Sequence, residues 1–153
     1  HIWSMAWGTR AAMAYCSLFP EKVISAVLSD ASIDVADTEA QKEGAREAVT
    51  KQLALGIHKY NKPEGWNAHQ DNTSMMSAMT AITKFDLSKV LEKLTMPVMV
   101  MTGDHDPNLT SSKKLVERLS NAKLVELKNV GHGSILQRPD LTTKEFLEFH
   151  KSL

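Results

Sequence analysis

Short apolar runs alternate with longer helical patterns along this sequence, and the alternation is what most limits how the chain can fold. Two β-branched, apolar runs of strand length, Val23 to Ser29 and Pro97 to Met101, predict strands that are covered on both faces. Apolar and polar residues alternate from Lys123 to Leu127, which predicts a third strand. Helical patterns lie before, between and after these runs, at 9–19, 39–55, 87–94, 111–120 and 141–153. Strands separated by helices form mostly parallel sheets with helices on the faces, so we predict an α/β fold.

The longest stretch between predicted strands holds helices of its own. Thr38 followed by Gln41 fits a capping box, which predicts that a helix begins there. Further along, methionines recur at helical spacing, at Met75, Met76 and Met79. Such a stripe either packs an amphipathic helix into a core or lines an adaptable apolar pocket, and the sequence leaves both interpretations open.

Charge and cysteine content exclude several classes of protein. Eighteen Lys and Arg balance eighteen Asp and Glu, and no basic run stands out, which argues against a nucleic-acid-binding role. No apolar stretch reaches the roughly 18 residues that span a bilayer, so we expect a soluble, cytoplasmic protein with no membrane partner. The single cysteine, Cys16, has no second cysteine to pair with, which excludes an internal disulfide.

Ligands of open parallel sheets bind beyond the carboxyl ends of the strands, so the residues that directly follow each strand are candidates for a site. The opening residues 1–3 look like the end of a strand, and Ser4 to Gly8 follow them. Thr102 to Pro107 and Asn129 to Gly133 follow two of the other strands. We predict no metal site, because metal-ligand spacing is absent around four further histidines that we expect to be solvated: His58, His69, His105 and His150.

The motifs after these strands resemble the C-terminal half of an α/β-hydrolase, the fold of many esterases and lipases. Residues 103–107 (GDHDP) are similar to the family's acid loop, and residues 131–132 (GH) to its histidine loop. Residues 18–23 (LFPEKV) resemble the link that follows the family's nucleophile helix. The order nucleophile, acid, histidine is the family's order. The resemblance implies that Asp106 is the catalytic acid, with Asp104 as the alternative, and that His132 is the base.

The nucleophile turn of this family has small residues two positions before and after the nucleophile, and it can be placed here in two ways. With Ser4 as nucleophile, the preceding small position would hold the β-branched Ile2. With position 6 as nucleophile, Ser4 and Gly8 are the small residues, and the distance to Pro20 matches the family. We favour the second alignment, with Ser4 kept as the alternative nucleophile.

The favoured alignment puts an alanine, Ala6, where the family has its nucleophile. Alanine has no oxygen to attack an acyl carbon, and loss of the nucleophile costs a triad several orders of magnitude in rate. Ala6 is then an engineered change, a natural loss, or a sign that Ser4 has taken over. The next residue, Trp7, resembles the family's source of one oxyanion N–H donor.

The resemblance also divides the chain into three segments. Residues 1–33 would hold the nucleophile turn with its helix and strand, 34–85 a helical cap insertion, and 86–153 a C-terminal core with the acid and histidine loops. The cap methionines Met75, Met76 and Met79 would line the substrate pocket. The chain starts at His1 without a methionine, and the family's first strands have no counterpart in it. We therefore expect that the remainder of a longer polypeptide, or a second copy in a homodimer, covers the exposed sheet edge.

These motifs favour a hydrolase of small carboxylic esters with a Ser/His/Asp mechanism and no cofactor, whose nucleophile is lost or replaced. Asp106 would fix the tautomer of His132 and leave Nε2 free to take a proton from a hydroxyl. One alternative is a non-catalytic binding protein that keeps the pocket. Another is an enzyme that uses His132 as a general base without a nucleophile. The expected partner is a small-molecule ester or acyl compound.

Overall fold

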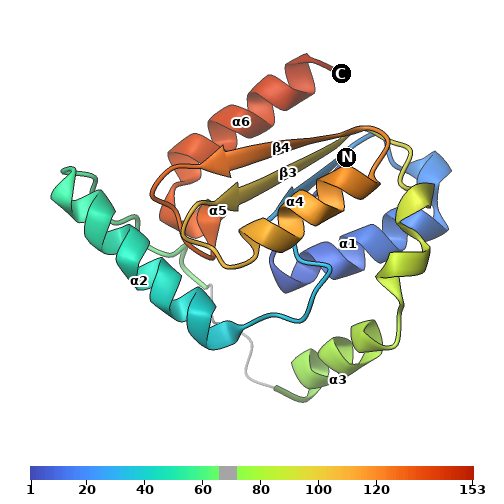
Figure 1. The fold of residues 1–153 in the computed structure, drawn as a ribbon, viewed down its shortest axis with the longest axis horizontal. Coiled ribbons are helices and arrows are strands. Elements are labelled where there is room, and N and C mark those ends of the chain that lie inside the picture. Colours follow the sequence, from blue (N-terminus) through green and yellow to red (C-terminus); the bar gives the residue numbers. More distant parts are fainter. Residues whose placement is uncertain (66–71) are drawn as a thin grey trace.

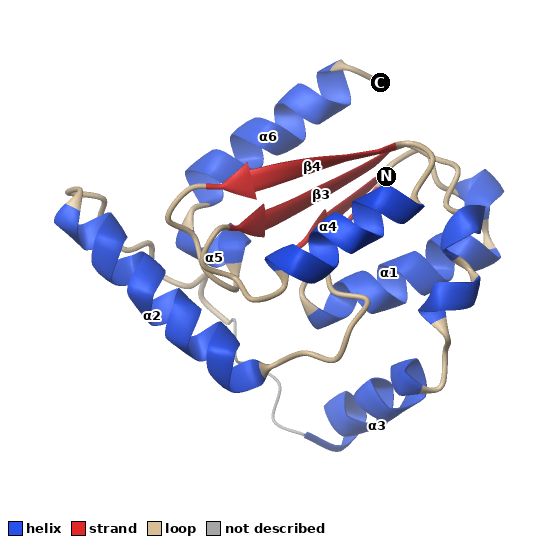
Figure 2. Cartoon of the chain, viewed as in Figure 1, coloured by secondary structure: helices blue, strands red, loops and turns tan. Residues whose placement is uncertain are grey.

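A four-stranded parallel sheet forms the centre of the molecule (Figures 1 and 2). The computed structural model describes residues 1–65 and 72–153, apart from the side chains of Met75, Met79, Ile82 and Thr83. The strands lie side by side in sequence order, in a register that aligns Leu28 with Ser4 on one side and with Val100 on the other. Their bounds are β1 (Ile2–Met5), β2 (Ala26–Ser29), β3 (Val98–Gly103) and β4 (Ala122–Leu127).

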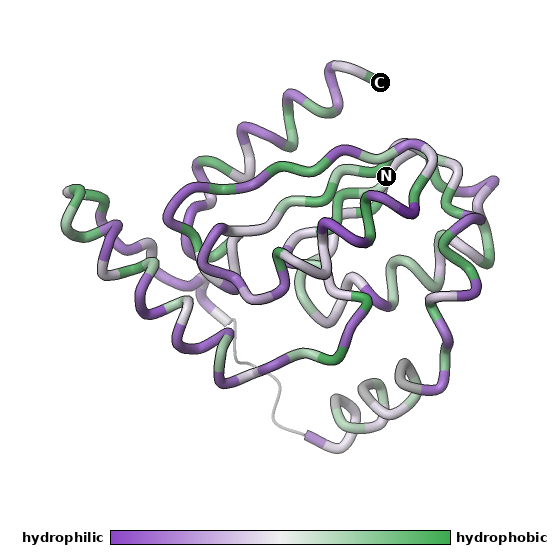
Figure 3. The backbone as a smooth tube through the Cα atoms, viewed as in Figure 1, coloured by the Kyte–Doolittle hydropathy of each residue, from purple (hydrophilic) through white to green (hydrophobic). Residues whose placement is uncertain are grey.

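Helices cover both faces of this sheet, so the molecule has three layers. Alternate residues of β2 and β3, such as Leu28 and Val100, pack on one face with α1 (Trp7–Leu18) and α4 (Leu109–Arg118). The residues between them, such as Val27 and Met99, pack on the other face with α6 (Pro139–Lys151). Every residue of β2 and β3 is therefore buried, which explains their continuous apolar sequence. Figure 3 shows the hydrophobic residues gathered along these strands. The α/β fold expected from the sequence is confirmed.

Two helices, α2 (Thr38–Ala54) and α3 (Asn72–Thr83), lie between β2 and β3 in the sequence. Figure 1 shows α2 beyond the arrowheads of β3 and β4, with α3 further from the sheet. A Cβ built on Gly44 of α2 would lie 1.9 Å from the carbonyl oxygen of His105, so α2 packs directly on the acid loop. Among the described residues, no helix is both long and apolar enough to cross a membrane.

Several element boundaries differ from the sequence prediction. The N-cap of α2 is Asp37 rather than Thr38, because the Asp37 carboxylate accepts a hydrogen bond from the backbone N–H of Ala40 (3.0 Å). The strand predicted from Val23 begins at Ala26, after a 3₁₀ turn, η1 (Pro20–Lys22). The helix predicted over 87–94 is instead a pair of 3₁₀ turns. These turns are η2 (Leu87–Lys89) and η3 (Leu91–Lys93). A short helix that was not predicted, α5 (Ser134–Gln137), precedes α6.

Candidate functional site

Ala6 sits on the sharp turn between β1 and α1. Its backbone has φ 52° and ψ −123°, a region that L-residues rarely adopt. The surroundings hold it there, since the N–H of Ala6 donates to the carbonyl of Ser29 (2.8 Å). The carbonyl of Ala6 accepts from both the N–H and the hydroxyl of Thr9, at 3.0 and 2.6 Å. A strained turn over-determined by its neighbours is the kind of backbone that presents a functional group.

Ser4 lies inside β1, two residues before this turn. Its Cβ is the closest atom to a Cβ built on Gly8, at 3.9 Å, so the Ser4 side chain faces the start of α1. Its hydroxyl oxygen is buried and has no hydrogen-bond partner in the described part of the chain. The tip of the turn therefore belongs to Ala6, and Trp7 begins α1, where the first backbone N–H groups have no acceptor within the helix.

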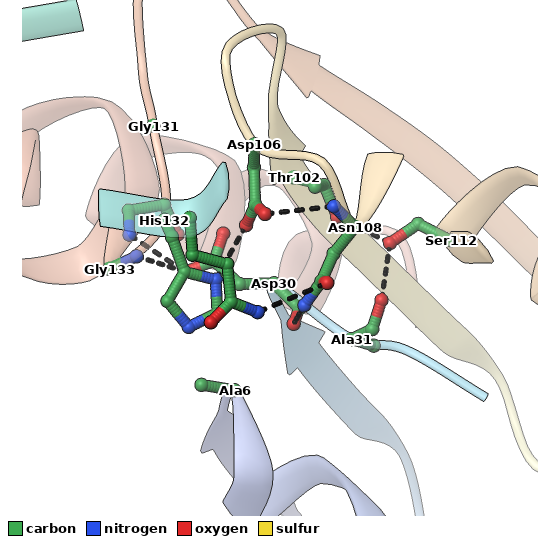
Figure 4. A network of polar contacts seen from close by, with 12 residues as sticks. Ala6, Asp30, Ala31, Thr102, Asp106, Asn108, Ser112, Gly131, His132 and Gly133 are labelled. Atoms are coloured by element: carbon green, nitrogen blue, oxygen red, sulfur yellow. Dashed lines mark hydrogen bonds and ion pairs between the residues drawn. The ribbon is translucent and has the colours of Figure 1, made fainter. Parts of the chain in front are cut away.

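Asp106 and His132 form a hydrogen-bonded pair at the carboxyl ends of β3 and β4 (Figure 4). The Nδ1 of His132 donates to the Oδ2 of Asp106 at 2.9 Å, because an ionised carboxylate can only accept. The Asp106 carboxylate is fully buried, and its other oxygen accepts from the backbone N–H of Asn108 (2.9 Å). This bond fixes the tautomer of the imidazole and leaves Nε2 free. In Figure 4 the imidazole lies between Asp106 and Ala6.

A glutamine holds the backbone on both sides of His132. The side chain of Gln137 accepts from the N–H of Gly131 (3.0 Å) and donates to the carbonyl of His132 (2.9 Å). The buried Gln52 of α2 donates to the carbonyl of Asn129 in the same loop (2.7 Å). The histidine loop is thus tied both to α5 and to α2.

Asp30 is a third ionisable residue beside the pair, and it is not among the residues predicted from the sequence. Its side chain is fully buried, and it brings a carboxylate oxygen within 4.8 Å of ligand atoms of Asp106 and His132. The signal was available, because Asp30 directly follows β2 just as the other two follow β3 and β4. These three residues could bring ligand atoms to a metal ion, but His132 Nδ1 already bonds to Asp106 and the Oδ2 of Asp30 to two backbone N–H groups.

The charge of the imidazole follows from these neighbours. Burial lowers the pKa of His132, but the hydrogen bond to Asp106 and the negative charges of Asp106 and Asp30 raise it further than burial lowers it. The pKa of His132 therefore lies above its ordinary value. The arrangement favours an imidazole that accepts a proton readily and holds it.

A cavity of about 350 Å³ opens beside the pair and the turn. Ala6, Trp7 and His132 line it together. Its apolar wall comes from the segment after β2, and its polar groups come from several elements. The remaining lining residues are Arg10, Ser32, Ile33, Asp34, Val35, Ala36, Thr38, Gln41 and Asn108. A small, largely apolar cavity with a few converging polar groups is the usual form of a small-molecule site.

The other residues singled out from the sequence lie elsewhere. Asp104 accepts from the backbone N–H of Val130 (3.2 Å), whereas Asp106 is the carboxylate that bonds to His132. Met76 is exposed and does not line the cavity. The side chains of Met75 and Met79, which we also predicted to line the pocket, lie outside the described part of the structure.

Two of the histidines expected to be solvated have partners instead. His105 contacts Lys51 (2.9 Å) and Glu47 (3.3 Å) of α2, and its side chain is only 13% exposed. His150 bonds to the carbonyl of Phe146 (2.8 Å) and packs against that ring. Both predictions were wrong, for different reasons. The partners of His105 lie on α2, more than 50 residues earlier in the chain, where the local sequence does not reveal them. His150 lies on α6 itself and bonds to the carbonyl four residues before it, on the side of the helix that packs on the sheet. His58 is exposed, and His69 lies outside the described residues.

Comparison with curated proteins finds a distant relative. The chain is 26% identical over 107 residues to the bifunctional esterase/perhydrolase of Acinetobacter calcoaceticus. The match covers 68% of this chain and 37% of that protein. No protein-family model matches the chain.

Solved structures share the fold over nearly the whole chain. The enol-lactonase of Burkholderia xenovorans LB400 is similar with a TM-score of 0.70 and 20% identity, covering 97% of this chain and 64% of that one. A thermophilic esterase of Thermogutta terrifontis is similar with a TM-score of 0.66 and 14% identity, and the match covers 99% of this chain and 64% of that one. An α/β hydrolase from a deep-sea metagenome library is similar with a TM-score of 0.64 and 18% identity, and the match covers 97% of this chain and 64% of that one. The chain thus has the α/β-hydrolase fold expected from its sequence, and it spans about two thirds of the length of these structures.

Proposed function

We propose that this chain carries the acyl-binding pocket and the acid–base pair of a hydrolase for small carboxylic esters, with alanine in the place of the nucleophile. One observation carries the proposal: Ala6, on a strained turn, lines the same cavity as an imidazole whose Nδ1 bonds to a buried carboxylate. The esterase/perhydrolase to which the chain is 26% identical supports the ester class. The apolar residues Ile33, Val35 and Ala36 of the cavity suit a small acyl group.

Each residue has a role in a chain with serine at position 6. The hydroxyl at this position attacks the acyl carbon while Nε2 of His132 takes its proton. Asp106 keeps the imidazole in the required tautomer and stabilises the imidazolium. The N–H of Trp7, at the start of α1, donates to the oxyanion. The acyl C–O bond of the ester then breaks, and the alcohol leaves with the proton held on Nε2 of His132. A water molecule, which gives its proton to Nε2, hydrolyses the acyl-enzyme, and the proton returns to the serine as the carboxylic acid is released. With Ala6 the pocket and the base remain, but the covalent step has no nucleophile.

A second function, ligand binding without turnover, is favoured by two observations. Ala6 presents a methyl group at the turn, and the Ser4 hydroxyl is buried inside β1 on the side that faces Gly8. In this case the chain binds the same small acyl compounds and releases them unchanged.

A serine at position 6 tests whether the site is that of a hydrolase without its nucleophile or that of a protein that only binds its ligand. We expect the parent chain to resist a fluorophosphonate probe, whereas Ala6→Ser is labelled at residue 6. We also expect Ala6→Ser to hydrolyse p-nitrophenyl butyrate at least 100-fold faster than the parent chain, a difference of about 2.7 kcal/mol in activation free energy. The double variant Ala6→Ser/His132→Ala is the matched control and returns to the parent rate.

Three results would contradict the proposal. Labelling of the parent chain at Ser4 would show that the turn has a different nucleophile. A folded Ala6→Ser chain that gains neither label nor hydrolysis would show that His132 does not act as its base. Equal activity of Ala6→Ser with and without His132 would show the same.

A further inference from the structure

Hydrogen bonds on both sides of its peptide backbone hold Asp30 in place. Its N–H donates to the carbonyl of Met101 on β3 (2.7 Å), and its own carbonyl accepts from the side chain of Asn108 (2.9 Å). Its φ of 56° lies in the left-handed region, which aspartate adopts more readily than most residues. The turn after β2 therefore directs the carboxyl toward the histidine loop, as Figure 4 shows.

The carboxyl of Asp30 binds the backbone that directly follows His132. Its Oδ2 accepts from the N–H of Gly133 (3.0 Å) and from the N–H of Ser134 (2.7 Å). Its Oδ1 is buried and makes no hydrogen bond within the described residues. One oxygen is thus an anchor for the loop, while the other is free to carry a proton.

In the part of the chain that the structure describes, two other ionisable groups lie beside Asp30, one from each neighbouring loop. Asp106 comes from the loop after β3 and His132 from the loop after β4, and oxygen or nitrogen atoms of all three lie within 4.8 Å of one another. Asn108 and Ser134 present neutral groups, and Arg10 of α1 donates to the carbonyl of Ser32. Burial above all, and next the charge of Asp106, raise the pKa of Asp30 to about 7.

We propose that Asp30 is a positioning residue for His132, which anchors the loop after the imidazole and adds a second acid to the Asp106–His132 pair. When Asp30 is ionised, its charge stabilises the imidazolium. When Asp30 is protonated, the loop keeps its anchor but the imidazolium loses one of its two negative neighbours. The ionisation of Asp30 and that of His132 are therefore linked, because each charge acts on the other.

The variant Asp30→Asn tests the charge separately from the anchor. Its amide oxygen can still accept from both N–H groups, so the loop keeps its support while the acid is removed. We expect the pKa of His132, followed by NMR of its ring, to fall in Asp30→Asn relative to the parent chain. Asp86→Asn, the same substitution at an exposed aspartate, is the control and should leave it unchanged. An unchanged His132 pKa in folded Asp30→Asn would overturn the proposal, whatever the esterase assays show.

A second measurement uses the unaltered chain and decides the matter if Asp30→Asn does not fold. Carboxyl ¹³C resonances of labelled aspartate report the ionisation of each side chain directly. We expect Asp30 to change near neutral pH, and the ring resonances of His132 to respond to the same step. A carboxyl that ionises in the ordinary aspartate range, well below the imidazole, would overturn the proposal. Both readouts follow ionisation and not turnover, so this inference and the proposed hydrolase can fail separately.

Discussion

Ala6 holds a backbone conformation that an alanine adopts only because its surroundings impose it. The hydrogen bonds to Ser29 and Thr9 oppose the preference of an L-residue for negative φ. Residues kept in such regions cost on the order of 1–3 kcal/mol each. The turn has this strained geometry although alanine has no hydroxyl to present, so the strain belongs to the fold of the turn and not to catalysis by this residue.

Glycine at position 6 should relieve this strain. We expect Ala6→Gly to raise the free energy of unfolding by about 1 kcal/mol, since the relief exceeds the roughly 0.4–1 kcal/mol that glycine costs through the unfolded chain. Ala11→Gly, at an exposed position inside α1, is the matched control and should lower the free energy of unfolding by about 1 kcal/mol. Urea denaturation of the three chains measures both. A loss of stability in Ala6→Gly would show that the turn is not strained.

Asp30 makes stability depend on pH in a defined direction. Its pKa is about 7 in the folded chain against an ordinary 3.8, so the folded state binds a proton more tightly. The stabilisation from this group is complete below pH 4 and is lost as the pH rises to about 7. We expect the free energy of unfolding to decline less over this interval in Asp30→Asn than in the parent chain. Parallel curves for the two chains would contradict the prediction.

Asp106 and His132 were predicted as site residues and Asp30 was not, and the difference has a physical cause. Asp106 and His132 lie in short motifs whose glycines and proline mark loops after strands. Asp30 directly follows β2 but has no glycine or proline beside it, and its partners Gly133 and Ser134 lie more than 100 residues further along the chain. Only the parallel arrangement of β2, β3 and β4 brings these segments together.

Among the secondary-structure elements, α2 is the one whose packing most directly supports the site. Gly44 faces the backbone of His105, and a Cβ on Gly131 of the histidine loop would lie 2.5 Å from the Cα of Ala45. The acid and histidine loops are therefore both pressed against one short stretch of this helix. A side chain in either place would separate α2 from the loops that carry Asp106 and His132.

The variant Gly44→Ala tests this contact, because the contact should make the substitution destabilising rather than stabilising. A glycine-to-alanine change inside a helix ordinarily stabilises it by about 1 kcal/mol. Here the new Cβ would meet the carbonyl oxygen of His105, so we expect a loss of roughly 1–3 kcal/mol, the cost of forcing extra atoms into a packed contact. Gly8→Ala in α1 is the control, because its Cβ would meet only the Cβ of Ser4 at 3.9 Å. Thermal melts compare the two, and a stabilised Gly44→Ala would contradict the packing.

The start of α2 gives a second test, in which the sequence prediction was wrong by one residue. Both Asp37 and Thr38 can cap a helix, but the carboxylate of Asp37 is the group that accepts from Ala40. We expect Asp37→Ala to lower the free energy of unfolding by about 1 kcal/mol. Thr38→Ala should cost less than half as much. The reverse order, measured by urea denaturation, would assign the cap to Thr38.

Strands were easier to predict than helices because burial leaves a direct trace in their sequence. The continuous apolar runs of β2 and β3 follow from being covered on both faces. The segment 87–94 shows the opposite case: Leu87, Leu91 and Leu94 are all in the core at helical spacing. Their backbone nevertheless forms bonds three residues apart, from Val90 to Leu87 and from Leu94 to Leu91, which apolar spacing alone cannot distinguish from an α-helix.

At the scale of the whole molecule, the sheet has an open edge at β1. Within the described residues β1 pairs only with β2, and the N–H groups of Ile2 and Ala6 both point to that partner. Because alternate residues of a parallel strand bond to the same side, the N–H groups of Trp3 and Met5 face away from the sheet. An uncovered edge of this kind is a template for another strand.

We expect a second copy of the chain to cover this edge, so that the 153-residue chain sediments as a dimer at high micromolar concentration. Amide hydrogen exchange locates the contact, since Trp3 and Met5 should be protected in the dimer and lose this protection on dilution. Ser4, whose N–H faces β2, is the internal control and should exchange slowly at both concentrations, since its partner lies within the same chain. A monodisperse monomer in which Trp3 and Met5 exchange freely at every concentration would show that β1 remains an open edge in this chain.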